Sequence, residues 1–248
     1  MRDVRVRHPP TRVASTASAA SIHRELLAQH DPARALGTQR YFKTGPGEYG
    51  EGDRFLGIPV PALRRTARDH RALAMRSVMT LLRSSWHEER QLALFILVWQ
   101  FEHGTESEQA DIYARYLQHT QYINNWDLVD CSAPQIVGGW LLRRDRWPLE
   151  TLRASSSVWE RRIAVLATYA FVKQGEFACS LRLAQCLLTD THDLMHKAVG
   201  WMLRDIGDGD RATLERFLDQ HVSAMPRTML RYAIEHFPDG LRRAYLAR

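Results

Sequence analysis

Three similar helical segments are spaced along the chain at multiples of one period. They are ERQLALFILVW from Glu89, ERRIAVLATYA from Glu160 and MHKAVGWMLRD from Met195. The last two begin 35 residues apart and the first two 71 residues apart, close to twice that spacing. A period in the thirties that holds two helices is typical of α-solenoids, in which each unit buries its apolar side against its neighbours. The sequence therefore predicts an all-α solenoid of antiparallel helix pairs.

Helical periodicity covers most of the remaining chain, and we find no alternating run of β-branched residues. Residues 1–17 are predicted to form a flexible basic tail, and residues 18–248 a single domain. After helices near Ser18 and over Ala33 to Phe42, a loop follows and then a helix from about Pro61. Further helices are predicted over residues 74–84, 87–102, 106–119, 123–131, 134–144, 148–154, 157–173, 176–188, 193–206, 210–220 and 226–236.

The charge of the chain favours a nucleic-acid partner. There are 34 Lys and Arg against 28 Asp and Glu, which leaves a net charge of +6. Arg far outnumbers Lys, and the planar guanidinium suits phosphate recognition. Arg groups recur near helix ends, so we expect a concave basic face that fits a DNA duplex, with a solvated polar face as the alternative. The groups are Arg64, Arg65, Arg68 and Arg71; Arg143, Arg144, Arg146 and Arg153; Arg161 and Arg162.

Cysteine and hydropathy patterns indicate a cytoplasmic protein. The three cysteines contain no CxxC pair and are too few for a disulfide framework. No apolar run approaches the length of a membrane span. The first residues lack the apolar segment of a secretory signal. We therefore expect no membrane association.

The stretch from Tyr122 to Trp140, YINNWDLVDCSAPQIVGGW, interrupts the repetitive pattern. Trp126 and Asp130 are four residues apart, so on a helix they share one face. A missing copy of the repeat would begin near Asn125. In that register Asp130 takes the place of Leu94, Val165 and Gly200 in the other copies. A carboxylate at a usually apolar position costs stability unless it is paired or solvated, which makes Asp130 a candidate functional residue. The alternative is a core Trp beside a surface Asp.

Two motifs resemble known sites but lack the required context. Gly45, Gly47 and Gly50 match a dinucleotide fingerprint, yet no strand precedes them and nearby carboxylates would repel a pyrophosphate. His192 and His196 imitate a zinc motif without its Glu or a third ligand. We therefore expect a structural or DNA-edge loop and two surface histidines, with no metal and no cofactor.

Several segments in order resemble the AlkD-type DNA alkylation repair glycosylases, which are built from HEAT-like repeats. The resemblance covers about Ser21 to Pro238. The matching segments are YFK at Tyr41, FLGIPVPALRR at Phe55, WDLVDCSAP at Trp126, WERRIAVL at Trp159 and HKAVGWMLRD at His196. The chain departs from the family in the Gly45–Asp53 loop, which is longer than in compact members.

The resemblance implies a set of site residues. It assigns the catalytic carboxylate to Asp130 and the two deoxyribose-contacting tryptophans to Trp126 and Trp201. Its functional arginine falls on Arg162, which we expect to hold a neighbouring DNA phosphate. Its tyrosine falls on Tyr41. From their neighbouring positions we also expect two further DNA contacts, which are Arg161 and Lys197.

The resemblance also implies an activity. The expected reaction is hydrolysis of the N-glycosidic bond of cationic alkylated purines, such as N3-methyladenine and N7-methylguanine, in duplex DNA, without a deep base pocket. With three lysines in the chain, we expect a monofunctional enzyme, although Lys197 lies near Trp201. We expect a monomer, and the resemblance implies a cytoplasmic protein that in use is associated with the bacterial nucleoid. The alternatives are a non-catalytic HEAT-like module that binds damaged or branched DNA, and a protein–protein scaffold.

Overall fold

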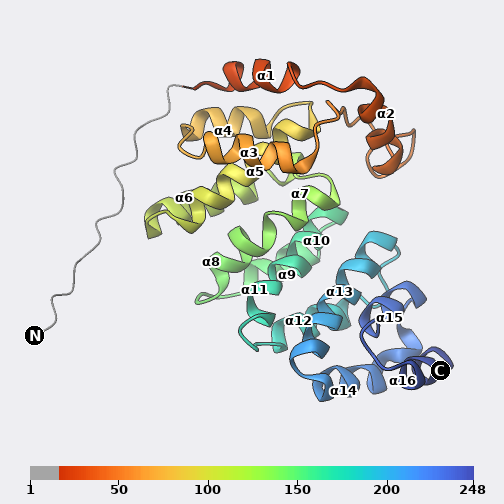
Figure 1. The fold of residues 1–248 in the computed structure, drawn as a ribbon. Helices are drawn as coiled ribbons and strands as arrows, with labels where there is room; N and C mark the ends of the chain where they lie inside the picture. Colours follow the sequence, from red (N-terminus) through yellow and green to blue (C-terminus); the bar gives the residue numbers. More distant parts are fainter. Residues whose placement is uncertain (1–16) are drawn as a thin grey trace, which may run out of the picture. The chain divides into compact units, whose positions relative to one another are not determined.

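The computed structural model describes residues 17–248, and the regular elements in this range are all helical (Figure 1). Outside the helices, an isolated β-bridge joins Arg54 and Trp86. The prediction of an all-α fold is therefore confirmed. The predicted tail, residues 1–17, lies outside the described residues except for Ala17. Within the described range, no helix is both long and apolar enough to cross a membrane.

The chain divides into two compact units. The first contains the described residues up to Phe42 together with Asp53–Ile96, and the second contains Lys43–Gly52 and Leu97–Arg248. The loop Lys43–Gly52 therefore belongs to the second unit, although the chain on either side of it belongs to the first. That residues 18–248 form a single domain stays a prediction.

The helices of the first unit begin at residues suited to helix starts. Ser18 caps the first helix through a hydrogen bond from the Ser21 amide, and Asp31 caps the second, which has Pro32 in its first turn. The helices are α1 (Ala19–Leu27), α2 (Pro32–Tyr41), α3 (Val60–Asp69), α4 (Met75–Leu82) and the first part of α5 (His87–Glu102).

A buried carboxylate organises the approach to α3. The Glu88 carboxylate accepts the backbone N–H groups of Leu56, Gly57 and Ile58 at 2.9, 2.8 and 3.3 Å. These amides precede α3 and would otherwise be buried without partners. The sequence segment FLGIP is thus held to the start of α5 through one side chain.

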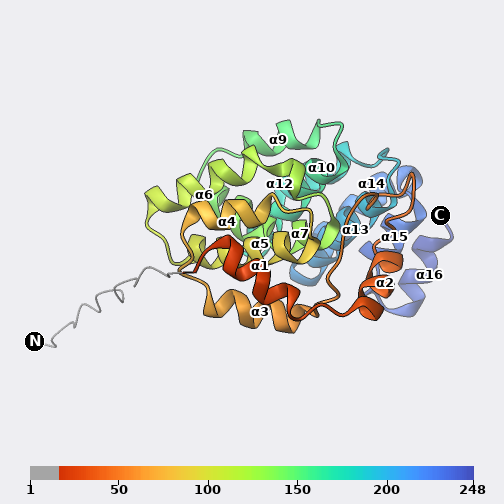
Figure 2. The same ribbon diagram turned by 90° about the horizontal axis from the view of Figure 1, so that it is seen from above.

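The second unit contains the remaining helices, which succeed one another with short connections. In both ribbon views α9 lies beside α10, and α13 lies beside α15 (Figures 1 and 2). The helices are α6 (Glu106–Gln118), η1 (Thr120–Tyr122), α7 (Trp126–Asp130), η2 (Pro134–Gly138), α8 (Gly139–Leu141), α9 (Trp147–Arg153), α10 (Val158–Ala167), α11 (Tyr169–Val172), α12 (Ala178–Cys186), α13 (Asp193–Gly209), α14 (Arg211–His221), η3 (Val222–Ala224), α15 (Arg227–Ala233) and α16 (Asp239–Leu246).

The predicted helices match this order, but the short helices η1 and η3 were not predicted, and two further differences concern longer segments. The helix predicted over residues 157–173 is broken at Thr168, whose hydroxyl donates to the Val165 carbonyl at 2.6 Å and replaces a helical interaction. The terminal helix α16 was not predicted, although Tyr245 on it is buried.

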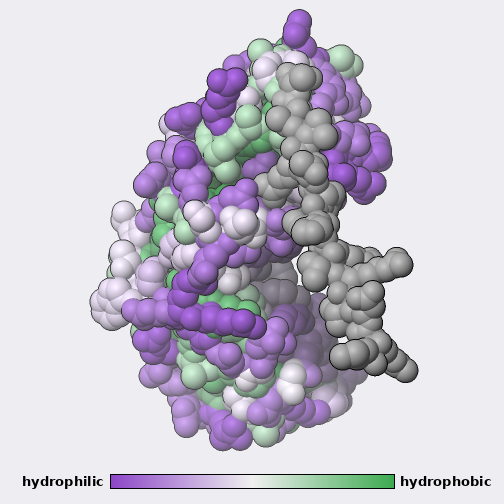
Figure 3. Space-filling model, turned by 90° about the vertical axis from the view of Figure 1, so that its left-hand side faces the viewer, coloured by the Kyte–Doolittle hydropathy of each residue, from purple (hydrophilic) through white to green (hydrophobic). Residues whose placement is uncertain are grey.

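Hydrophilic residues predominate on the face drawn in Figure 3, with hydrophobic residues between them.

Gly200 allows α13 and α15 to approach closely. A Cβ atom at this position would lie 2.5 Å from the Cβ of Tyr232 and 2.6 Å from the carbonyl oxygen of Met229. Gly138 has a similar role, since a Cβ there would lie 2.2 Å from the Ala167 carbonyl oxygen. Both glycines therefore set how closely helix backbones pack in the second unit.

Gly200→Ala is expected to lower the free energy of unfolding by about 1–3 kcal/mol, because the added methyl group overpacks the α13–α15 contact. The measurement is urea unfolding followed by circular dichroism. Gly37→Ala is the matched control, because its added Cβ meets no atom within 4 Å and lies on α2. It should be neutral or stabilising by up to about 1 kcal/mol. Equal stability of the two variants would contradict the close-approach argument.

Candidate functional site

The Asp130 carboxylate of α7 and the Arg162 guanidinium of α10 form a bidentate ion pair. Arg162 Nε donates to Asp130 Oδ1 and Nη2 donates to Oδ2, both at 2.7 Å. Its Nη1 donates to the Leu194 carbonyl of α13 at 2.6 Å. The Arg162 side chain is 5% exposed and the Asp130 side chain 18% exposed. One arginine therefore joins three helices, and the carboxylate keeps a path to solvent.

Local sequence explains how Asp130 reaches this position. The fully buried Asn125 caps α7 by accepting the Trp126 amide at 2.8 Å, and Asp130 is the last residue of this short helix. Behind it, the Ser132 hydroxyl donates to the Leu128 carbonyl at 2.6 Å and pairs with the Tyr116 hydroxyl at 2.9 Å. Asp130 is thus held by a short helix with a polar anchor at each end.

Burial raises the pKa of Asp130, and the hydrogen bonds and charge of Arg162 oppose this rise without cancelling it. The nearby charge of Asp127 raises the pKa of Asp130 further. Because the pKa of the folded state is raised, this group favours the folded state most at low pH. That contribution is lost as pH rises through the raised pKa.

The repeat register explains why Asp130 is unusual. The equivalent positions Leu94, Val165 and Gly200 are buried within their own units, as the register predicts. Asp130 occupies the same kind of position with a charged group, and Arg162 satisfies that charge. Trp126, one turn before Asp130, is half-buried.

Trp201 lies on α13, two turns beyond the Leu194 carbonyl that binds Arg162, and residues at this spacing share a helix face. Its ring centroid is 6.2 Å from that of Tyr169. Burial raises the pKa of Asp205, and a hydrogen bond from the Trp201 side chain opposes this rise. The indole therefore has two partners, the Tyr169 ring and the Asp205 carboxylate.

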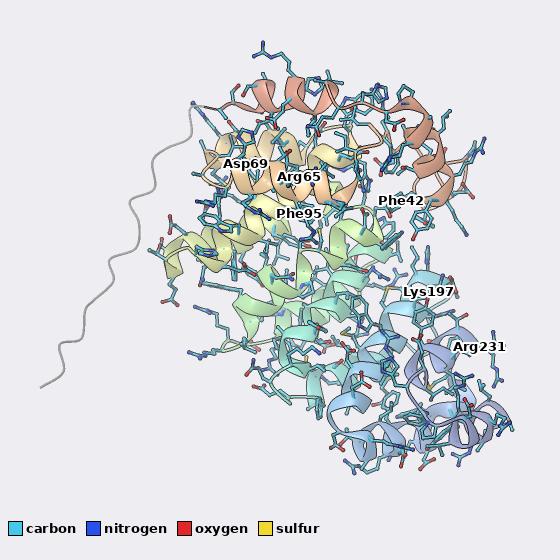
Figure 4. All side chains as sticks on the ribbon, viewed as in Figure 1. Phe42, Arg65, Asp69, Phe95, Lys197 and Arg231 are labelled. Atoms are coloured by element: carbon cyan, nitrogen blue, oxygen red, sulfur yellow. The ribbon has the colours of Figure 1, made fainter. Side chains whose placement is uncertain are left out.

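Lys197 lies one turn before Trp201 on α13, whose neighbour α15 carries Arg231 (Figure 4). Its ammonium is 2.7 Å from the Asp193 carboxylate and its side chain is 39% exposed. The hydrogen bond with Asp193 is the largest cause that raises the pKa of Lys197, and Tyr232 and Tyr49 add to the rise. The amine is thus held in its protonated form.

Arg161 uses its donors within the second unit. Its Nε donates to Asp190 Oδ2 at 2.7 Å, and its Nη1 donates to the Ser155 and Ser156 carbonyls at 3.1 and 2.9 Å. Other arginines of the predicted basic groups also form ion pairs inside this unit. The pairs are Arg144 with Glu106, Arg146 with Glu176 and Arg153 with Glu150. Whether a concave basic face exists stays a prediction.

The two histidines singled out in the sequence have structural partners. His192 Nδ1 accepts the Leu194 amide at 3.2 Å, and His196 Nε2 lies 2.5 Å from the Asp190 carbonyl oxygen. Over residues 17–248, no group of three or more His, Cys, Asp or Glu side chains is arranged to hold a metal ion.

The glycine-rich loop folds around its own carboxylates. The Gly45 amide donates to Glu48 and the Gly47 amide donates to Glu51, both at 2.9 Å. Amides that would cradle a phosphate in a dinucleotide site are therefore taken up by acidic side chains. The loop also carries Tyr49, whose ring lies 6.0 Å from that of Trp159 at an interplanar angle of 72°. No sequence pattern singled out Tyr49.

Tyr41 belongs to the first unit and is the last residue of α2. Its side chain is 66% exposed. Its ring packs edge-on against that of Phe42, with the ring centroids 5.2 Å apart. The structure therefore brings together Asp130, Arg162 and the α13 backbone in the second unit. The expected role of Tyr41 stays a prediction.

Comparison with known proteins identifies the family. Residues 22–237 match the model of the DNA alkylation repair enzyme family, so the chain belongs to this family. The resemblance predicted from the sequence is confirmed. The chain is therefore an enzyme of DNA alkylation repair, and DNA is its partner.

A solved structure has a similar fold. It is a predicted DNA alkylation repair enzyme from Enterococcus faecalis, with a TM-score of 0.65 and 16% sequence identity. The similarity covers 85% of this chain and 97% of the other, and it supports the predicted all-α solenoid class. A search of curated protein sequences gave no match.

Replacement of Arg162 by Met is expected to lower the free energy of unfolding by about 3–5 kcal/mol at neutral pH, because Asp130 then keeps a buried charge without its partner. The loss should be smaller at acid pH, where Asp130 is protonated. The double variant Asp130→Asn/Arg162→Met should recover part of it. Urea unfolding at two pH values provides the measurement.

Arg143→Met is the control, since Arg143 is an exposed residue and its change should stay within about 0.5 kcal/mol. If the effects of Asp130→Asn and Arg162→Met on the free energy of unfolding simply add in the double variant, the two side chains act independently. That result would contradict the prediction.

Proposed function

We propose that the protein is a monofunctional DNA glycosylase that hydrolyses the N-glycosidic bond of cationic alkylated purines in duplex DNA. N3-methyladenine and N7-methylguanine are the expected lesions. The observation that carries the proposal is the Asp130 carboxylate. Both of its oxygens accept a hydrogen bond from Arg162, yet the side chain is 18% exposed. Membership in the DNA alkylation repair enzyme family supports it.

The chemistry requires few groups. An alkylated purine of this kind carries a positive charge, so the electron pair of the breaking C1′–N bond neutralises the departing base and no general acid is needed. Positive charge then develops on the deoxyribose, and a water molecule adds to C1′ and loses a proton. An ionised carboxylate at a fixed position stabilises this charge and orients the water.

Asp130 retains the capacity for this role while it is paired with Arg162. A carboxylate has about four lone-pair directions, and the two hydrogen bonds from Arg162 use one on each oxygen. The remaining lone pairs are available to a water molecule or to the cationic sugar. Because the guanidinium fixes both oxygens, little reorganisation is needed during the reaction.

This geometry changes the role we assign to Arg162. From the sequence we expected it to bind a DNA phosphate, but its Nε, Nη1 and Nη2 donate to Asp130 and to the Leu194 carbonyl. We therefore propose Arg162 as a positioning residue for Asp130. Phosphate contact is assigned to more exposed side chains, which include Lys197 and Tyr41. Arg161 would have to exchange Asp190 for a phosphate to make such a contact.

The two tryptophans are proposed to complete the sugar site. The faces of indole rings carry negative π density, which attracts a cationic sugar at close range. Trp126 and Trp201 are both half-buried, so each has an anchored ring with part of its surface accessible. The anchoring of Trp201 by Tyr169 and Asp205 would hold its ring in one orientation.

Water, rather than an amine, is the proposed nucleophile. A lyase would need a neutral lysine to form a Schiff base with the sugar. The hydrogen bond that Lys197 donates to Asp193 raises the pKa of Lys197, which keeps it charged at neutral pH. Lys197 is therefore suited to bind a phosphate and poorly suited to attack C1′.

Asp130→Asn is expected to reduce the release of methylated base from alkylated duplex DNA by about 10²–10³-fold, because the charge that stabilises the sugar is removed. Release is measured by chromatography of the free base, with a protein-free sample to subtract spontaneous loss. Asp127→Asn is the matched control, as the neighbouring carboxylate of the same helix lies outside the ion pair; it should retain release. Thermal melting of each variant confirms that it is folded.

The proposal fails if the wild-type protein releases no methylated base under conditions in which a known alkylpurine glycosylase does. It also fails if folded Asp130→Asn releases base at the wild-type rate.

The rate of base release is expected to fall at acid pH, with its midpoint above 3.8, the ordinary value for an aspartate. Ionised Asp130 is the active form, and burial raises its pKa, so activity is lost as pH decreases through that raised pKa. Asp127→Asn should move the midpoint to lower pH, because the charge of Asp127 contributes to the rise. The measurement is the single-turnover rate against pH. A midpoint at or below 3.8 would contradict the assignment.

A further inference from the structure

We propose that Tyr49 and Lys197 together bind one phosphate of the DNA backbone beside the Asp130 site. The inference rests on the proposed function, since it deepens the description of the same site. It assigns a DNA-binding role to the Lys43–Gly52 loop.

The loop has a defined shape that is suited to hold a side chain in place. In addition to the carboxylate contacts of Glu48 and Glu51, the Gly50 amide donates to the Lys43 carbonyl at 3.1 Å. Gly47 and Gly52 adopt φ values of 75° and 80°, which residues with side chains rarely reach. Tyr49 is therefore presented by a closed loop with its own hydrogen bonds.

The loop places Tyr49 against the helix that supplies Arg162. The Tyr49 ring meets the Trp159 ring edge-on, with centroids 6.0 Å apart. Trp159 and Arg162 are three residues apart on α10, so they lie on neighbouring positions of one helix face. Trp159 is buried, and the edge-on contact fixes the Tyr49 ring at the border of this face.

Lys197 approaches the same region from α13. The Leu194 carbonyl, one turn earlier on this helix, accepts Arg162 Nη1 at 2.6 Å. Tyr49 is close enough to Lys197 for its phenol to contribute to the raised pKa of the amine. The phenol, from the loop, and the ammonium, from α13, therefore both lie near the helices that the Arg162 contact joins.

These two groups have the chemistry of a phosphate site. A phenol donates one hydrogen bond, and an ammonium carries three donors, of which Asp193 accepts one. Tyrosine hydroxyls and lysine ammonium groups are frequent partners of DNA phosphates. The acidic side chains of the loop, Glu48 and Glu51, accept backbone amides within the loop. These two carboxylates therefore have partners within the loop.

The test measures the binding of an unmodified DNA duplex by fluorescence anisotropy, so that it does not depend on base release. Tyr49→Phe retains the ring on Trp159 and loses the hydroxyl, so affinity is expected to fall about tenfold with unchanged thermal stability. Lys197→Gln should weaken binding and reduce the slope of log affinity against log salt by about one. The double variant should lose less than the product of the two single effects, because both groups hold one phosphate.

Tyr113→Phe is the matched control. Its ring stacks on Trp140, and its hydroxyl is among the buried polar atoms without a hydrogen-bond partner in the described part of the chain. This variant should bind DNA as the wild type does.

Three outcomes would overturn the inference. They are wild-type affinity in Tyr49→Phe, independent effects of the two single variants, and no duplex binding by the wild-type protein. Wild-type affinity in Tyr49→Phe together with a lower melting temperature in Tyr49→Ala would show that Tyr49 only packs on Trp159. These results are separate from the excision assay. Loss of affinity in Tyr49→Phe supports the phosphate site even if Asp130→Asn leaves base release unchanged.

Discussion

The ion pair between Asp130 and Arg162 is the interaction on which the second unit depends most. The removal of two charges from water is costly, and their attraction compensates only when the geometry is good and the remaining donors are satisfied. Arg162 meets this condition by using Nε and Nη2 on the carboxylate and Nη1 on the Leu194 carbonyl. As a consequence α7, α10 and α13 have one shared connection, and none of the three can shift without leaving a buried polar group unpaired.

The same pair reconciles stability with the proposed chemistry. A fully buried carboxylate would be protonated or inaccessible, and a fully solvated one would be a weak electrostatic stabiliser. Asp130 lies between these limits, because burial raises its pKa while Arg162 opposes the rise and part of the side chain remains exposed. Fixed orientation in a partly dry site strengthens the effect of a charge on a transition state.

Formal charge alone does not describe the surface available to DNA. Many arginines that form groups in the sequence are ion-paired within the second unit, including Arg144, Arg146 and Arg161. Their charge is largely balanced by local carboxylates. Lys197 keeps a more exposed ammonium despite its contact with Asp193. Recognition of a duplex therefore depends on which cations lie at the surface with donors to spare, and this follows from packing.

The helical character of the chain, the order of most helices and the anomaly at Asp130 could be predicted from the sequence, because helical periodicity and repeat register are local properties. The pairing of Arg162 with Asp130, 32 residues away, and the contact of Tyr49 with Trp159 could be seen only in the folded chain. The break at Thr168 was also missed, although its hydroxyl donates to the local Val165 carbonyl, and the same hydroxyl has a more distant partner in Ser180. Contacts between distant segments depend on how helix faces meet, and no local pattern specifies this.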